Sequence, residues 1–274
     1  MKFFLDFVLI LFFSNHYYCL SIEEFYPFGK LAGDKVLFKN DDGFDGPISI
    51  STTFPFFNKS YDSLFINTNG LISFENGVSE YSPIQFPLQR VIGVSPYWTD
   101  INTLVGGDVF YREILDANLL NQFAAEIRRA FPSLYNFRPT WAYMSTWYQV
   151  AAHGSQMPQF NNTFQAVVVT NGQYSFTIYN YENLMWPNSL INKKVQAGFN
   201  AGDGVTYYTI NGSFTDEIPM ILSNSSNVGI DGKWIFRVDN NNITSGGCST
   251  TGFLTVTPNN VFAIGGSYIT VSGN

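Results

Sequence analysis

The sequence predicts a mostly β domain that carries one packed α-helix and is built as an antiparallel sheet or a sandwich. Three observations lead to this prediction. Aromatic residues make up 18% of the 274 residues, and the 27 Phe and 16 Tyr suit a pleated, half-buried surface better than a helix. Short apolar runs bounded by Gly, Pro, Asn or Asp recur along the chain. One segment, residues 116–131, instead repeats its apolar residues at helical spacing.

Residues 1–21 are expected to form a secretory signal peptide. Lys2 comes before an apolar run that Asp6 interrupts and that is too short to span a bilayer. Cys19 and Ser21 are the small residues that such a signal needs next to a cut after Ser21. The alternative is an uncleaved membrane anchor. The signal predicts a secreted or extracellular protein, or the ectodomain of a larger one.

The net charge of −7 is unchanged by loss of residues 1–21, which removes one base and one acid. An acidic surface disfavours nucleic acid and anionic membranes as partners. Association with a membrane is expected only through parts beyond residue 274, if at all. Behind a signal peptide, five Asn-x-Ser/Thr sequons are candidate N-glycosylation sites: Asn58, Asn161, Asn211, Asn224 and Asn242.

The chain contains two cysteines, and Cys19 is expected to leave with the signal peptide. Core packing rather than disulfides must then hold the domain together, which is feasible at this size. Cys248 is left over. A leftover cysteine in a secreted protein usually has a partner, and we expect that partner to lie outside the domain.

The first predicted hairpin centres on Asn69-Gly70. This pair favours a two-residue type I′ turn, which places Phe65 opposite Phe74 and Asn67 opposite Ile72.

The second predicted hairpin centres on Asn171-Gly172. The same turn type places Val169 opposite Tyr174 and Val167 opposite Phe176 on an apolar face. The other face is mostly small or polar, which is typical of a half-buried antiparallel hairpin.

Five further segments are predicted strands: residues 47–52, 108–114, 195–201, 205–210 and 233–238. In the predicted helix, Asp116 is the expected N-cap and Pro132 ends the pattern. Five apolar residues lie along one side of it: Leu119, Leu120, Phe123, Ile127 and Phe131.

The sequence indicates a main domain over residues 22–240. Asn, Gly, Ser and Thr then accumulate, so residues 241–252 are predicted to be a linker. Residues 253–274 begin a new strand pattern, but 22 residues are too few to bury a core. We interpret this tail as the truncated start of a second β domain.

The stretch VIGVSPYWTDINT, residues 91–103, raises the question of catalysis. Asp100 and Asp108 have the residue type of a glycosidase pair, which would make the protein a carboxylate-dependent hydrolase. The favoured interpretation is structural. Asp100 and Asn102 follow a buried aromatic strand, where short polar side chains cap the backbone of a turn, and Gly106-Gly107 then reverses the chain.

The acids Asp41, Asp42 and Asp45 resemble a calcium-binding loop. An EF-hand requires a Glu eleven residues after its first ligand, and that position is Thr52. We therefore favour a simple turn. A calcium site that includes partners distant in sequence is left open.

No other motif indicates chemistry. His153 is the single histidine after residue 21, and a lone loop histidine is more often a surface residue than a base. The sequence contains no nucleophile elbow, P-loop, dinucleotide-binding glycine motif or Cys/His zinc set. We predict no catalytic residue, no metal ligand and no cofactor. Four aromatic residues suit either sugar stacking or core packing: Trp141, Tyr143, Trp147 and Tyr148.

A series of motifs resembles the nidogen extracellular domain (NIDO) family in the family's order, over roughly residues 22–240. The motifs are FYPFG (25–29), AGD (32–34), DDG (41–43), FPFF (54–57), SLFINTNGLISF (63–74), IGVSPYWTDINT (92–103), DVFYRE (108–113), NTFQAVVVTNGQYSFTIYNY (162–181), AGFNAGDG (197–204) and NVGIDGKWIFRVD (227–239).

This resemblance implies an extracellular protein, as are nidogen, tectorin, membrane mucins and Mesh-like junction proteins. It implies adhesion between cells and matrix and no enzymatic activity. Trp98 and Asp100 match a family signature of a structural kind, and the resemblance transfers no binding residue. The tail is similar to the start of an IPT/TIG domain through Pro258, Gly265-Gly266 and residues 268–274.

The function expected from these observations is that of a non-enzymatic extracellular adhesion or matrix module. It would bind extracellular matrix or cell-surface proteins by surface complementarity. Two alternatives remain at this point: a lectin-like domain that binds glycans through exposed Trp and Tyr, and the carboxylate-dependent hydrolase.

Overall fold

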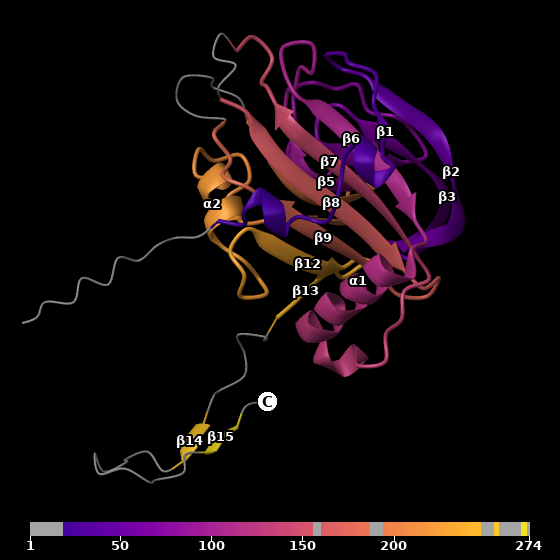
Figure 1. Cartoon of the computed structure of the whole chain (residues 1–274), viewed down its shortest axis with the longest axis vertical. Helices are drawn as coiled ribbons and strands as arrows, with labels where there is room; N and C mark the ends of the chain where they lie inside the picture. The colour runs from indigo at the N-terminus through magenta and orange to yellow at the C-terminus, as the bar shows by residue number, and fades with distance from the viewer. Residues whose placement is uncertain (1–18, 156–159, 187–193, 248–254, 258–269, 273–274) are drawn as a thin grey trace, which may run out of the picture.

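The computed structural model describes residues 19–155, 160–186, 194–247, 255–257 and 270–272 (Figure 1). Most of the predicted signal peptide, Cys248 and most of the tail lie outside these residues. The described part is mostly β, with two antiparallel sheets packed as layers and two α-helices. This arrangement confirms the predicted mostly β, sandwich-like fold.

The first sheet has seven strands. Their order is β1 (Lys35–Val36), β6 (Asp108–Ile114), β7 (Trp141–Val150), β8 (Asn162–Thr170), β9 (Ser175–Tyr181), β12 (Lys233–Arg237) and β13 (Thr244–Ser245). The second sheet has six strands. Their order is β11 (Tyr207–Thr209), β10 (Gln196–Asp203), β5 (Gln89–Trp98), β4 (Leu71–Phe74), β3 (Lys59–Asn67) and β2 (Phe44–Phe56). The five further predicted strands correspond to β6, β12 and parts of β2, β10 and β11.

An aromatic core lies between the two sheets. Its largest fully buried members include Phe54, Phe74, Tyr97, Trp141, Trp147, Tyr181 and Trp186. Two of these rings donate hydrogen bonds to backbone carbonyls of the other sheet: Trp147 Nε1 donates to Thr68 O (3.1 Å) and the Tyr181 hydroxyl to Pro96 O (2.8 Å). A buried ring with a satisfied polar end is stabilising, so these contacts join the two sheets.

The helix α1 (Ala117–Ala130) covers the outer face of the first sheet (Figure 1). The Asp116 carboxylate accepts the backbone N–H groups of Asn118 (3.1 Å) and Leu119 (3.0 Å), as expected of an N-cap. Phe123 and Ile127 are fully buried against that sheet. The predicted helix, with its cap, is confirmed. A second helix, α2 (Ile218–Asn224), was not predicted because its single buried stripe spans only two turns.

The first hairpin differs from the prediction by one residue. Phe65 pairs with Ser73 and Asn67 with Leu71, so the connection has three residues rather than two. The Gly70 N–H donates to Asn67 O (3.3 Å), and of the three loop residues only Gly70 has a positive φ, of 82°. A three-residue loop with glycine in the left-handed position therefore replaces the type I′ turn.

The second hairpin differs by two residues. Thr170 pairs with Ser175, and the Asn171 side chain holds the four-residue loop by accepting the N–H groups of Gln173 (3.1 Å) and Tyr174 (2.9 Å). A shift of two keeps each side chain on its predicted face. The hairpin is not half-buried, however. Both β8 and β9 are buried on both faces, because α1 packs on one side and the second sheet on the other.

Trp98 packs outside the sandwich core. It lies against Leu71, Val78 and Phe86, and its Nε1 donates to Glu80 O (3.1 Å). The long connection between β4 and β5 thus covers the outer face of the second sheet. Among the described residues, neither helix has the length and apolar character that crossing a bilayer requires.

Glu113 of β6 ties β2 to the first sheet. Its Oε1 accepts the Ser51 N–H and hydroxyl, both at 2.7 Å, and the Trp141 indole N–H at 2.5 Å. Burial alone would raise the pKa of this carboxyl. The hydrogen bonds from Ser51 and Trp141 outweigh burial and lower the pKa below its ordinary value of 4.5. The ionised form of Glu113 therefore stabilises the fold.

We predict that Glu113→Gln lowers the free energy of unfolding at pH 7 by about 1–2 kcal/mol, since the hydrogen bonds from Ser51 and Trp141 then have a neutral acceptor and are weaker. Because the folded pKa is depressed, this contribution is present above pH 4.5 and disappears as the pH falls through the lower folded value. Urea unfolding of both proteins between pH 7 and pH 3 measures the difference. Glu23→Gln, on the exposed surface, controls for loss of one charge. A difference that persists unchanged at low pH would contradict the assignment.

Candidate functional site

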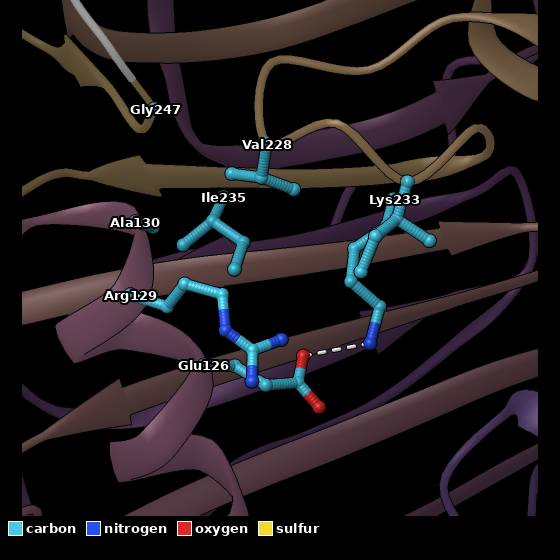
Figure 2. Close-up of a pocket in the computed structure, with 8 residues that line it drawn as sticks. Glu126, Arg129, Ala130, Val228, Lys233, Ile235 and Gly247 are labelled. Carbon is cyan, nitrogen blue, oxygen red and sulfur yellow. Dashed lines mark hydrogen bonds and ion pairs between the residues drawn. The ribbon is translucent and has the colours of Figure 1, made fainter. Parts of the chain in front are cut away.

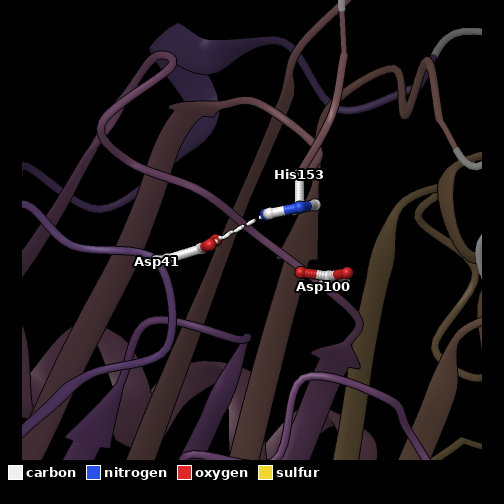
Figure 3. Close-up of side chains that lie close together, drawn as sticks. All are labelled: Asp41, Asp100 and His153. Carbon is white, nitrogen blue, oxygen red and sulfur yellow. Dashed lines mark hydrogen bonds and ion pairs between the residues drawn. The ribbon is translucent and has the colours of Figure 1, made fainter.

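Three loops meet at one end of the sandwich and bring together Asp41, Asp100 and His153 (Figure 3). Asp41 lies between β1 and β2, Asp100 follows β5, and His153 follows β7. One potential ligand atom from each side chain lies within 4.8 Å of the others. The three residues come from both sheets, so the sandwich itself creates the cluster.

Backbone hydrogen bonds hold the three loops to one another. Thr103 N donates to Asn40 O (3.0 Å), Asn102 N to Ala151 O (2.9 Å), and His153 N to Asp100 O (3.0 Å). These bonds satisfy loop amides in the way that strand pairing satisfies sheet amides. The loops therefore form one hydrogen-bonded unit rather than three independent connections.

The side chain of Asn69, in the turn between β3 and β4, is hydrogen-bonded to two of these three loops. Its Oδ1 accepts the buried Ile101 N–H (2.8 Å), and its Nδ2 donates to the Asp42 carboxylate (2.9 Å). Asn69 is almost fully buried. One amide group thus fixes both the segment that carries Asp100 and the carboxylate that follows Asp41 in the chain.

The cluster combines a buried carboxylate with an exposed ion pair. Asp100 is 4% exposed. His153 Nδ1 lies 2.8 Å from Asp41 Oδ2, and these two side chains are 49% and 32% exposed. An opening of about 330 Å³ is lined by Asp42, Tyr81, Asp100 and His153. An imidazole nitrogen and two carboxylates are together a donor set suited to a divalent metal ion.

The sequence did not predict this cluster. His153 was interpreted as a lone loop residue, whereas the structure pairs it with Asp41 and places Asp100 beside it. The positions are 59 and 53 residues apart along the chain, and no local motif links them. Only the pairing of loops from two sheets brings them together.

Two of the acids considered in the sequence have other partners in the structure. Asp45 accepts a hydrogen bond from the Tyr111 hydroxyl. Asp108 pairs with Lys39 (3.4 Å) and is absent from the group that contains Asp100. The turn interpretation of residues 99–107 is confirmed at Asn102, whose Oδ1 accepts the Leu104 N–H (2.9 Å).

The aromatic residues considered for sugar stacking are not available on the surface. Trp141 and Trp147 are fully buried and Tyr143 is 2% exposed, because all three point into the core between the sheets. Tyr148 is partly exposed, and the centroid of its ring lies 5.4 Å from that of Phe28 and 6.3 Å from that of Phe110. The lectin-like interpretation based on these tryptophans was therefore wrong.

The five sequons lie on accessible segments. Asn58, Asn211 and Asn242 are exposed, and Asn161 and Asn224 are partly exposed. Each remains a candidate glycosylation site.

A second, smaller hollow lies between α1 and β12 (Figure 2). Its volume is about 40 Å³, room for a few water molecules at most. Lys233 Nζ lies 2.6 Å from Glu126 Oε2 there, and the Tyr26 hydroxyl donates to the same oxygen (2.8 Å). This partly buried ion pair joins the helix to the sheet, and the Tyr26 hydroxyl adds the N-terminal segment, which is a structural role.

The family model described as "Nidogen-like domain" matches residues 62–240, more than half of the chain. The chain belongs to the nidogen-like domain family. The resemblance inferred from its motifs is thereby confirmed.

Relatives of this nidogen-like domain include alpha-tectorin of Mus musculus, 34% identical over 243 residues, which cover 84% of this chain and 11% of the relative. Nidogen-1 of Mus musculus is 31% identical over 240 residues, with 80% and 19% covered. Dendrite extension defective protein 1 of Caenorhabditis elegans is 28% identical over 223 residues, again with 80% and 19% covered. No solved structure matches the chain.

The nidogen-like domain thus spans less than a fifth of the length of these relatives. Nidogen and tectorin are extracellular matrix proteins, and the domain is extracellular as predicted. Asp100 and His153 lie inside the matched range, and Asp41 lies before it.

In the tail, β14 (Thr255–Thr257) pairs with β15 (Thr270–Ser272). The likeness of this tail to an IPT/TIG domain stays a prediction, as do the domain boundaries.

We predict that Asn69→Ala lowers the free energy of unfolding by about 1–3 kcal/mol, because the buried Ile101 N–H loses its acceptor. Chemical denaturation of the purified domain measures this change. Asn171→Ala, which removes a similar amide acceptor from an exposed hairpin loop, is the matched control and should cost less. Equal stability of Asn69→Ala and the wild type would show that Asn69 does not hold the loops.

Proposed function

We propose that this nidogen-like domain is a non-enzymatic extracellular matrix module that binds a protein partner through its loop end. The loop end is defined here as residues 37–43, 99–107 and 151–155 together with Tyr81. The observation that carries the proposal is the exposure of large apolar side chains there: Phe38 is 87% exposed, Leu104 67% and Tyr81 55%.

These apolar side chains lie on a rigid base. The Asn40 side chain donates to Phe38 O (2.6 Å), and Asn40 N donates to Thr103 Oγ1 (2.9 Å), next to Leu104. Tyr81 lines the same opening as Asp42, Asp100 and His153. Several exposed apolar groups on loops that are already ordered favour binding, because little conformational entropy is lost on association.

The charged side chains of the loop end are placed to form the polar rim of a protein interface. Asp41, Asp42 and the Lys39–Asp108 ion pair are partly exposed beside the apolar side chains. Protein interfaces typically combine apolar anchors with such a rim. None of the five sequons lies on residues 37–43, 99–107 or 151–155, although Asn161 precedes Asn162, the partner of Val150 in β7.

Two observations support a binding role over catalysis. Asp108 is paired with Lys39 (3.4 Å) and is not a member of the cluster that contains Asp100, which favours separate roles for the two carboxylates considered for hydrolysis. The relatives named nidogen and tectorin are matrix proteins, which favours an extracellular matrix or cell-surface protein as the partner.

We predict that Phe38→Ser combined with Leu104→Ser reduces binding to the matrix partner by at least about 10-fold, since the few anchor residues that dominate an interface each cost more than about 1 kcal/mol when truncated. Cross-linking of the secreted protein on cell-derived matrix, followed by quantitative mass spectrometry, measures which proteins are retained. The matched control is Val205→Ser combined with Met220→Ser, which removes two exposed apolar side chains that are not part of the loop end. Equal retention by both double variants would exclude the loop end as the contact surface.

A further inference from the structure

We propose that Asp41, Asp100 and His153 form a binding site for one divalent transition-metal ion, with Zn²⁺ as the preferred ion. Metal binding goes beyond the proposed function, because a protein contact at the loop end does not itself require an ion. The two proposals are therefore tested separately.

The distances fit a site that closes around an ion. Zn²⁺ binds histidine nitrogen and carboxylate oxygen at about 2.0–2.2 Å, so two ligands of one ion lie roughly 3–4 Å apart. In this structure the three ligand atoms lie within 4.8 Å of one another. Asp41 and His153 are partly exposed at their side chains, so small rotations of these two side chains close the difference.

The donor set distinguishes this cluster from an ordinary group of surface acids. One of the three donors is an imidazole, which suits zinc and other transition metals, whereas calcium and magnesium prefer oxygen alone. Asp100 is 4% exposed and sits on a segment fixed by Asn69, so this ligand is already in place. Sites with preset ligands bind ions more tightly than flexible ones.

The cavity next to the cluster supplies the remaining coordination positions. The opening of about 330 Å³ reaches Asp100 and His153 and has room for water molecules or a partner's side chain as additional ligands. The Asp42 carboxylate also lines this opening and is held by Asn69 Nδ2 (2.9 Å). Asp42 is therefore placed to orient a metal-bound water from outside the three direct ligands.

Because of the position of the site, a bound ion would link the two sheets. Asp100 follows a strand of the second sheet and His153 follows a strand of the first, while Asp41 lies on the connection that runs from one to the other. An ion bound by all three links both sheets at the loop end. Because such an ion binds only the folded state, it also stabilises the fold.

The test uses the secreted protein, purified without a polyhistidine tag, stripped with a chelator and exchanged into metal-free buffer. Isothermal titration with Zn²⁺ is expected to show one ion per chain. His153→Gln and Asp100→Asn should each weaken binding by more than about 100-fold, since losing even an outer partner of a metal ligand costs 10–100-fold. Asp108→Asn removes a neighbouring carboxylate outside the cluster and should bind Zn²⁺ as the wild type does.

A second readout identifies the ligands directly. Co²⁺ in place of Zn²⁺ should give a visible absorption spectrum that changes in His153→Gln and is unaltered in Asp108→Asn. Circular dichroism reports whether each variant is folded. If Asp100→Asn is not secreted, the result for His153→Gln decides, because the His153 side chain is 49% exposed and its substitution should leave the fold intact. Three results would overturn the proposal: no Zn²⁺ binding by the wild type, the same Zn²⁺ affinity in His153→Gln as in the wild type, or tighter binding of Ca²⁺ than of Zn²⁺ by the wild type.

Discussion

Burial of aromatic side chains between the two sheets is the constraint on which the rest of the structure depends. Trp147 of the first sheet donates its indole N–H across the core to Asn67 O (3.2 Å) and Thr68 O (3.1 Å). The Tyr181 hydroxyl reaches Pro96 O on the second sheet. Each ring thus fixes part of the opposite sheet: Trp147 fixes the start of the turn that carries Asn69, and Tyr181 the end of β5, which Asp100 follows. The relative position of the sheets therefore determines which loop residues meet.

The local features of the fold were predictable from the sequence, because their causes are local. The helix α1 follows from its apolar spacing and from Asp116, which caps it as expected. The hairpin registers were not predictable from the Asn-Gly pairs alone. In one loop the Asn171 side chain bonds its own backbone, and in the other Asn69 turns its side chain toward Ile101 and Asp42, so neither pair forms the expected two-residue turn. Side-chain hydrogen bonds of this kind compete with the intrinsic turn preference.

The candidate site was not predictable because it has no signature within any one segment. Asp100 looked like a turn residue, and Asn102 beside it does cap that turn. The structural interpretation of residues 99–107 was thus sound, yet the same turn delivers a buried carboxylate to Asp41 and His153. The turn that follows β5 therefore also places the Asp100 carboxylate in the cluster. The proposed binding surface lies on loops that connect the strands of the sandwich in any case.

The loop end is preformed by the fold. Amide hydrogen exchange of the secreted wild-type protein, resolved by residue, measures this directly. Ile101, Asn102, Thr103 and His153 donate their N–H groups within the hydrogen-bonded unit. We expect these amides to exchange nearly as slowly as those of the fully buried strand β8. Exchange at the rate of an unstructured loop would contradict it.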